Sequence, residues 1–132
     1  MSAQAEVFTA DLPPDPGLLR HFRERLGAWL DAAFVTERAR AAILLAAHEA
    51  AANAIEHAAA PVTVVGRLEP DVILIEVTSA GRWAAHAQAI SDERGRGIAL
   101  MRGLLSDLEI LAEEERTIVR LRMIRSEATP SF

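Results

Sequence analysis

Apolar and polar residues first alternate and then recur at helical spacing near the start of the chain. Glu6 to Thr9 alternates as a half-buried strand does, and the prolines that follow force the chain to turn. Asp15 before Pro16 is a typical helix start, with an N-cap aspartate and proline at the first helical position. Apolar side chains at helical spacing then predict an amphipathic helix that packs through Leu18, Phe22, Leu26, Trp29, Leu30 and Ala33.

A second helix is predicted through the alanine-rich segment from Thr36, a favourable N-cap, to His57 or Ala58. At about 100° per residue its polar side chains share one side, and its apolar side chains lie opposite. The polar side comprises Glu49, Asn53, Glu56 and His57, and the apolar side comprises Ile43, Leu44, Ala47, Ala51, Ala54 and Ile55. A polar stripe of this kind is typical of any solvated helix face, so alone it does not indicate a function.

The middle of the chain predicts a hairpin followed by a long loop. Val62 to Leu68 and Val72 to Thr78 have strand-like patterns and flank the turn sequence Glu69-Pro70-Asp71, so we expect antiparallel neighbours. From Ser79 to Arg96 the periodicity fails, and small, polar and charged residues dominate. A loop of that length in a compact domain is usually functional or mobile.

The last third of the chain predicts one short helix and two strands. The helix spans Ile98 to Leu105, and the strands span Leu108 to Leu111 and Thr117 to Met123, with a solvated acidic turn at Glu113-Glu114-Glu115. The whole order is strand, helix, helix, strand, strand, loop, helix, strand, strand. It predicts an α+β fold, a two-layer sandwich in which helices cover one face of a mostly antiparallel sheet. We expect residues 1–132 to form a single domain.

Composition excludes several classes of function. A formal charge of −5 and a pI of about 5.3 argue against direct binding to nucleic acid, which needs a basic surface. The absence of cysteine removes disulfides, thiolate catalysis and cysteine-type zinc sites. No run of eighteen apolar residues and no signal-peptide pattern is present, so we expect no membrane span and a cytoplasmic protein.

Three features together match the needs of a nucleoside triphosphate site. Asn53 offers a carbonyl oxygen to magnesium, and Glu49, one helical turn earlier, offers a carboxylate that can accept a proton from a substrate hydroxyl. Gly95-Arg96-Gly97 stands directly before a predicted helix, where backbone N–H groups bind anions well. Each feature alone is weak evidence for such a site, and the combination is stronger than any part alone.

Two sequence motifs resemble those of the GHKL ATPases. The run from Glu49 to Ala58 resembles the N-box of that superfamily, in the form typical of anti-sigma-factor serine kinases of the RsbW type. Gly95 to Met101 resembles the second glycine box, and Gly81-Arg82-Trp83 resembles the sequence after the first box. The resemblance covers about residues 5 to 125 and implies the Bergerat fold, also called the histidine kinase-like ATPase (HATPase) fold.

The resemblance implies roles for individual residues and implies ATP and Mg²⁺ as cofactors. Asn53 corresponds to the magnesium ligand and Glu49 to the catalytic base. The remaining implied nucleotide-binding residues are Ser79, Gly81, Gly95, Arg96, Gly97 and Thr117.

The first box departs from the family pattern at Ser79. Relatives have an aspartate there, which accepts a hydrogen bond from the adenine amine. A neutral hydrogen bond contributes about 0.5–1.5 kcal/mol against about 1.5–3 kcal/mol for one to a charged group. The difference predicts ATP binding roughly 5- to 30-fold weaker than with aspartate. Trp83 also replaces the second glycine of the box, and Arg116 replaces the usual glycine before Thr117.

The implied function is that of a bacterial anti-sigma factor with protein serine/threonine kinase activity. Such a protein binds a sigma factor, phosphorylates a STAS-domain anti-anti-sigma antagonist, regulates transcription by partner switching and forms a homodimer. An alternative is a non-catalytic switch module that binds sigma factor or antagonist but has weakened or lost nucleotide binding at Ser79. A detached ATPase domain like that of histidine kinases is disfavoured, because no phosphoacceptor helix precedes the N-box.

Overall fold

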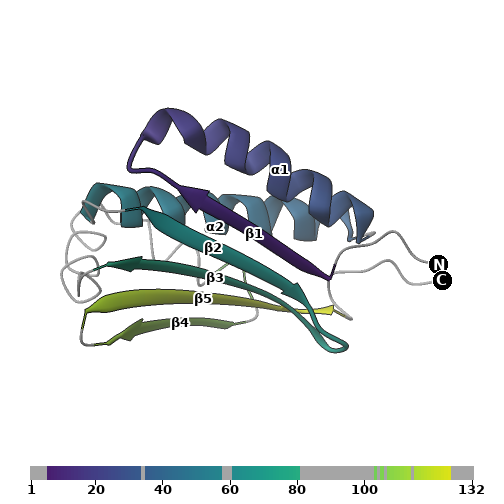
Figure 1. The fold of residues 1–132 in the computed structure, drawn as a ribbon. Coiled ribbons are helices and arrows are strands. Elements are labelled where there is room, and N and C mark those ends of the chain that lie inside the picture. Colours follow the sequence, from purple (N-terminus) through teal and green to yellow (C-terminus); the bar gives the residue numbers. More distant parts are fainter. Residues whose placement is uncertain are drawn as a thin grey trace.

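The computed structural model shows two long helices lying across one face of a sheet (Figure 1). It describes residues 6–33, 35–57, 61–80, 103, 105, 107–113 and 115–125. Within these residues the elements are β1 (Val7–Leu12), the 3-10 turn η1 (Pro16–Leu18), α1 (Leu19–Ala32), α2 (Glu37–His57), β2 (Val62–Leu68), β3 (Val72–Ala80), β4 (Asp107–Ala112) and β5 (Arg116–Ile124).

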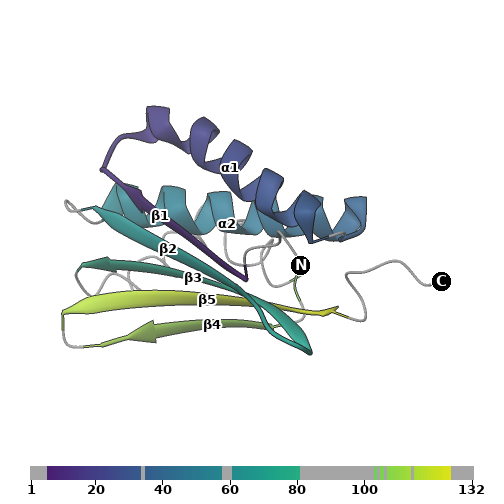
Figure 2. The same cartoon turned by 45° about the vertical axis from the view of Figure 1, so that its right-hand side comes forward.

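The sheet has the order β1-β2-β3-β5-β4, and all four neighbouring pairs are antiparallel. Both helices lie on the same side of it, as the rotated view in Figure 2 shows. The predicted α+β two-layer fold is therefore confirmed, including the antiparallel pairing of β2 with β3. No helix in the described part of the chain is long and apolar enough to cross a bilayer.

Both predicted helix caps are present. The Asp15 Oδ1 accepts a hydrogen bond from the Gly17 N–H at 2.9 Å, and the Thr36 Oγ1 accepts one from the Ala39 N–H at 3.1 Å. The first helix nevertheless begins with the 3-10 turn η1, which the sequence pattern does not predict. A 3-10 turn has three residues per turn, so its side chains leave the α-helical stripe, and Leu18 is 37% exposed while Leu19 is buried.

Two strands extend further than their hydrophobic patterns predict. The prediction that the loop begins at Ser79 is wrong, because β3 continues to Ala80, with Ser79 opposite Thr117 on β5. Hydrogen bonding to the neighbouring strand keeps this small, polar end in the sheet without help from apolar side chains. At the other edge β1 continues past Thr9 to Leu12, beyond its predicted end. There the Asp11 Oδ1 accepts a hydrogen bond from the Thr63 hydroxyl at 3.2 Å.

Several predictions fall on residues outside those described. They concern the loop from residue 81 to 96, most of the helix from 98 to 105, and the middle of the acidic turn at residue 114. Gly103 is helical, in agreement with the predicted helix. The backbone N–H of Glu113 donates to the Arg116 carbonyl at 2.8 Å, which agrees with a turn between β4 and β5.

The core lies between the sheet and α2, and α1 packs against α2 and β1. α2 contacts α1 on one side and β2, β3 and β5 on the other, so it is buried on two sides. Its alanines permit close approach to both neighbours, and five of them are fully buried: Ala46, Ala47, Ala50, Ala51 and Ala54. The alanine enrichment of this segment therefore reflects packing of a central helix.

The sheet face away from the helices carries ion pairs. Arg120 on β5 lies 2.6 Å from the Glu76 carboxylate on β3 and 3.5 Å from the Glu109 carboxylate on β4. Arg122 lies 2.6 Å from Glu109 and 3.0 Å from Asp107. The hydrogen bond from Arg120 to Glu76, together with the nearby carboxylates, raises the pKa of Arg120, against a smaller opposing effect of burial. The helix-covered face therefore holds the core, and the open face is charged.

Gly66 on β2 leaves room for the indole of Trp29 on α1. A Cβ atom at position 66 would lie 3.1 Å from Trp29 ring carbons and 3.1 Å from Ile75 Cδ1. We expect Gly66→Val to lower the free energy of unfolding by about 1–3 kcal/mol through overpacking, measured by urea denaturation. Gly66→Ala is the matched control and should have the smaller effect, since one methyl needs a shift of only a few tenths of an ångström. An unchanged unfolding midpoint for Gly66→Val would show that the Trp29 contact does not constrain this position.

Candidate functional site

Three polar residues are buried within the described part of the chain: Asn53, Ser79 and Thr117, with exposed fractions of 6%, 3% and 0%. Asn53 lies near the end of α2, Ser79 near the end of β3, and Thr117 near the start of β5. Both views show these three ends at the same end of the helix–sheet sandwich (Figures 1 and 2). Three residues predicted for one site thus lie at the same end of the fold, and Ser79 and Thr117 are direct neighbours there.

Strand alternation places the two hydroxyl residues on the face that the helices cover. On β3 the buried positions alternate and include Val77 and Ser79, and on β5 Thr117 and Val119 face the same way. Ser79 and Thr117 are direct cross-strand partners. Ser79 and Thr117 lie at the end of the helix-covered face of the sheet, beyond Val77 and Val119. Their hydroxyl groups therefore have aliphatic neighbours.

Asn53 does not lie on a solvated helix face. Its side chain is buried, which the amphipathic pattern of α2 alone does not reveal. No hydrogen bond joins its amide group to another described residue. Leaving a buried polar group without a partner costs about 1–3 kcal/mol, so this amide is expected to have a ligand. Its carbonyl oxygen is a ligand type that magnesium accepts.

Glu49 lies one turn before Asn53 on α2 and is half-buried. Residues four apart on a helix share a side, so both side chains project in a similar direction. No hydrogen bond or ion pair joins the Glu49 carboxylate to another described residue. Within the described residues, the Glu49 carboxylate is therefore available to accept a hydrogen bond from an incoming hydroxyl.

His48, the residue before Glu49, connects α2 to α1. Its Nδ1 lies 3.0 Å from Nη1 of Arg23. Burial, and to a smaller extent the positive charge of Arg23, lower the pKa of His48 below 6.5, while the Glu49 carboxylate acts in the opposite direction. His48 is thus held in its neutral form beside the candidate catalytic residue.

The lowered pKa of His48 predicts a loss of stability in acid. Below pH 6.5 the unfolded chain binds a proton at His48 more readily than the folded protein does, so the free energy of unfolding should fall with pH there. Well above pH 6.5, His48 is neutral in both the folded and the unfolded protein, so it adds no pH dependence to the free energy of unfolding. Urea denaturation between pH 5 and 8 should show a smaller acid loss for His48→Gln than for the unsubstituted protein. Identical pH profiles would contradict this assignment.

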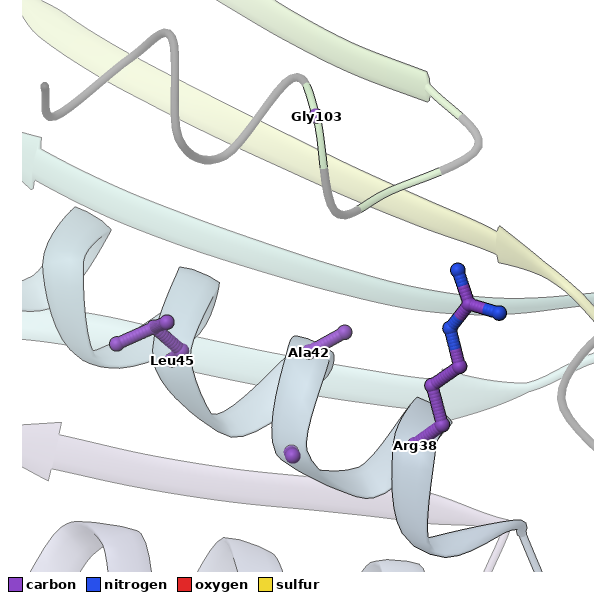
Figure 3. A pocket seen from close by; sticks show the side chains of 5 residues that line it. Arg38, Ala42, Leu45 and Gly103 are labelled. Carbon is purple, nitrogen blue, oxygen red and sulfur yellow. The ribbon is translucent and has the colours of Figure 1, made fainter.

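Two cavities border α2. The first, of about 250 Å³, is lined by Arg38, Ala41, Ala42, Leu45 and Gly103. Figure 3 shows Arg38 and Ala42 projecting from α2 toward the segment that carries Gly103. Leu45 lies one turn before Glu49, so this cavity adjoins the candidate residues along the helix. No motif includes Arg38, but its spacing of seven residues to Leu45 and eleven to Glu49 places all three on one side of the helix.

The second cavity, of about 450 Å³, lies where the start of α1 meets the end of α2, and is lined by Pro14, Pro16, Leu19, Ala52, Ile55 and Glu56. The described lining of neither cavity includes Glu49, Asn53, Ser79 or Thr117. Among the residues that the structure describes, no group of three or more His, Asp or Glu side chains is placed to hold a metal.

The predicted phosphate-binding residues are not among those described. They are Gly81, Gly95, Arg96 and Gly97. The side chain of His57 is likewise outside the described part. The structure therefore places Glu49, Asn53, Ser79 and Thr117 of the predicted site, and the glycine-rich side stays a prediction.

The family described as the histidine kinase-like ATPase domain matches residues 12–123. The chain belongs to this family. ATPase domains of this family bind ATP, usually with Mg²⁺. The matched range contains all four of the placed site residues and both long helices.

A solved structure has the same fold as this chain. It contains the RsbU and RsbW domains of Rv1364c from Mycobacterium tuberculosis, with a TM-score of 0.77 and 22% sequence identity. The similarity covers 96% of this chain and 34% of that chain, so this ATPase domain spans about a third of the solved chain's length. No curated protein matches the sequence.

Proposed function

We propose that this ATPase domain binds Mg-ATP at the end of the α2–sheet interface and acts as an anti-sigma factor that phosphorylates a protein antagonist. The observation that carries the proposal is the convergence of Asn53, Ser79 and Thr117, the three buried polar residues of the described part, at one end of the sandwich. Asn53 is a buried amide without a hydrogen-bond partner among the described residues, which costs stability, and a bound ligand would offset that cost.

Asn53 is the residue that fits magnesium. Its amide is buried and has no hydrogen-bond partner among the described residues, and its oxygen suits a hard cation. Magnesium is usually held by one or two protein groups together with phosphate oxygens and water, so a single asparagine is a sufficient protein contribution. When bound, the ion neutralises charge that develops on the phosphates.

Glu49 is the proposed general base. The hydroxyl oxygen of a serine or threonine in the antagonist attacks the γ-phosphorus, the bond from the γ-phosphorus to the β–γ bridging oxygen breaks, and ADP leaves. Glu49 accepts the proton that the attacking hydroxyl loses. The position of Glu49 one turn before Asn53 supports this role, because residues four apart on a helix project in a similar direction.

Ser79 and Thr117 are proposed to contact the nucleobase. A nucleoside triphosphate carries its charge on the phosphates. The uncharged base is therefore the part that suits a buried surface of hydroxyl and aliphatic groups. Gly95, Arg96 and Gly97, with Gly81, are proposed to hold the phosphates, as their resemblance to the family's glycine boxes implies.

The proposed partners are a sigma factor, a STAS-domain anti-anti-sigma factor and a second copy of this chain. Two findings support this regulatory role: the resemblance of the N-box segment to kinases of the RsbW type, and the structural similarity to a solved chain that contains an RsbW domain. A protein that regulates a sigma factor works in the cytoplasm, where we propose that this domain acts.

Ser79 favours a second candidate function. Because a neutral hydroxyl stands where relatives have a carboxylate, the protein is alternatively a switch module that binds sigma factor or antagonist without useful nucleotide affinity. Calorimetric titration of the purified protein with Mg-ATP and Mg-ADP separates the two. Saturable binding, followed by transfer of labelled γ-phosphate to a STAS-domain protein, supports the kinase. Absence of binding to either nucleotide, with sigma factor still retained, supports the switch module.

A further inference from the structure

The first half of α2 exposes an apolar side chain at the edge of a cavity. Leu45 is 44% exposed, and it lines the cavity of about 250 Å³ together with Ala41 and Ala42. Gly103 lines the same cavity, and a Cβ atom there would meet nothing within 4 Å. Because Ala41 and Leu45 are exposed, a side chain of another molecule can reach this apolar recess from the solvent.

Arg38 adds a positive charge to the recess. Figure 3 shows its side chain extending from α2 toward the segment that carries Gly103. No hydrogen bond or ion pair joins the Arg38 guanidinium to another described residue, whereas Arg40, on the next turn side of the same helix, is paired with Asp31. A guanidinium without a carboxylate partner, next to an apolar surface, suits a ligand in which a carboxylate stands near an apolar group.

The recess lies on the same side of α2 as the proposed general base. At about 100° per residue, Arg38, Leu45 and Glu49 fall within roughly 40° of one another around the helix. At about 1.5 Å per residue, Leu45 lies about 6 Å and Arg38 about 16 Å from Glu49 along the helix axis. A protein segment that brings a hydroxyl to Glu49 and continues toward the start of α2 therefore passes over Leu45 and Arg38.

We infer that the Arg38–Leu45 recess, formed by Arg38, Ala41, Ala42, Leu45 and Gly103, is a docking subsite for the protein that receives the phosphate. The inference rests on the proposed kinase function and assigns the chemistry of the acceptor's contact. An apolar side chain of the acceptor packs on Leu45, close to the phosphorylated hydroxyl, and a carboxylate farther along pairs with Arg38. The bound acceptor covers this ion pair, which strengthens it relative to a pair exposed to water.

Calorimetric titration of the full chain with a STAS-domain acceptor protein tests the contact. Arg38→Ala should raise the dissociation constant by about 10-fold, and Arg38→Glu should raise it further because two carboxylates would then face each other. Leu45→Ala should raise it by about 5-fold. Arg67→Ala and Arg67→Glu are the matched controls, since they make the same changes in net charge at an exposed position on β2 and should bind the acceptor normally.

Steady-state transfer of labelled phosphate distinguishes docking from catalysis. Arg38→Ala and Leu45→Ala should raise KM for the acceptor protein and leave kcat and the affinity for Mg-ATP nearly unchanged. Gly103→Leu tests the recess without altering Arg38 or Leu45, because it places a side chain in space that is empty around Gly103. It should weaken binding of the acceptor in the same way.

Far-UV circular dichroism and thermal melting establish that each variant is folded. If Arg38→Glu and Leu45→Ala bind the acceptor as tightly as the unsubstituted protein does, the inference is overturned and the proposed kinase function stands. A loss of Mg-ATP affinity in Arg38→Ala, with acceptor binding intact, also overturns it and assigns Arg38 to the nucleotide. Failure of the unsubstituted protein to phosphorylate the STAS-domain protein overturns the proposed kinase function and the inference together.

Discussion

Asn53→Ala is expected to abolish binding of Mg-ATP and phosphoryl transfer together. The substitution removes the buried amide oxygen that is proposed to hold magnesium, and without the ion the charge of the phosphates would not be neutralised. Titration with Mg-ATP, and transfer of labelled phosphate to a STAS-domain protein, measure the two losses. Both should fall below detection under conditions where the unsubstituted protein is saturated.

The free energy of unfolding distinguishes a loss of magnesium binding in Asn53→Ala from a loss of the folded structure. The amide has no hydrogen-bond partner among the described residues, and alanine is the better helix former, so Asn53→Ala should not lower the free energy of unfolding without nucleotide. Glu56→Ala, an exposed position three residues later on α2, is the control and should retain Mg-ATP binding. An Asn53→Ala protein that binds Mg-ATP normally would remove Asn53 from the site. One that melts early would assign it a structural role.

The helices and most of the sheet follow from local sequence patterns. Asp15 and Thr36 cap helices because their side-chain oxygens satisfy free backbone N–H groups, which is a property of adjacent residues alone. The end of β3 could not be predicted in this way. Ser79 and Ala80 belong to a strand because β5, which lies about forty residues later, pairs with them. Pairing with a distant segment can hold residues in a strand although their own sequence does not favour one.

The resemblance to family motifs predicted more residues of the candidate site than the pattern of polar and apolar positions did. The spacing of Glu49 and Asn53 predicts a common direction, and both residues lie within the helix α2. The pattern gave no indication that Asn53 is buried, because the polar stripe of a helix is ordinarily solvated. Burial of a helix side chain depends on the segments that pack against it, which is a property of the assembled fold.

Glu49→Ala is expected to separate catalysis from binding. Loss of a positioned general base lowers the rate of phosphoryl transfer by about 10²- to 10⁴-fold. Affinity for Mg-ATP should stay nearly unchanged, because the proposed role of Glu49 concerns the attacking hydroxyl rather than the nucleotide. Single-turnover transfer of labelled phosphate to a STAS-domain protein measures the rate, and calorimetry measures the affinity. Glu49→Gln keeps the size and polarity of the side chain and should show the same loss of rate.

His48→Gln is the matched control for Glu49, since it changes the adjacent residue and leaves the carboxylate in place. It should transfer phosphate at close to the unsubstituted rate. If Glu49→Gln loses Mg-ATP binding together with transfer, Glu49 acts in binding the nucleotide. If transfer is unaffected in both Glu49 variants, another group accepts the proton.

A pull-down without nucleotide tests the non-catalytic switch module. If the protein is such a module, Glu49→Ala and Asn53→Ala should both still retain sigma factor, because partner binding then depends on neither side chain.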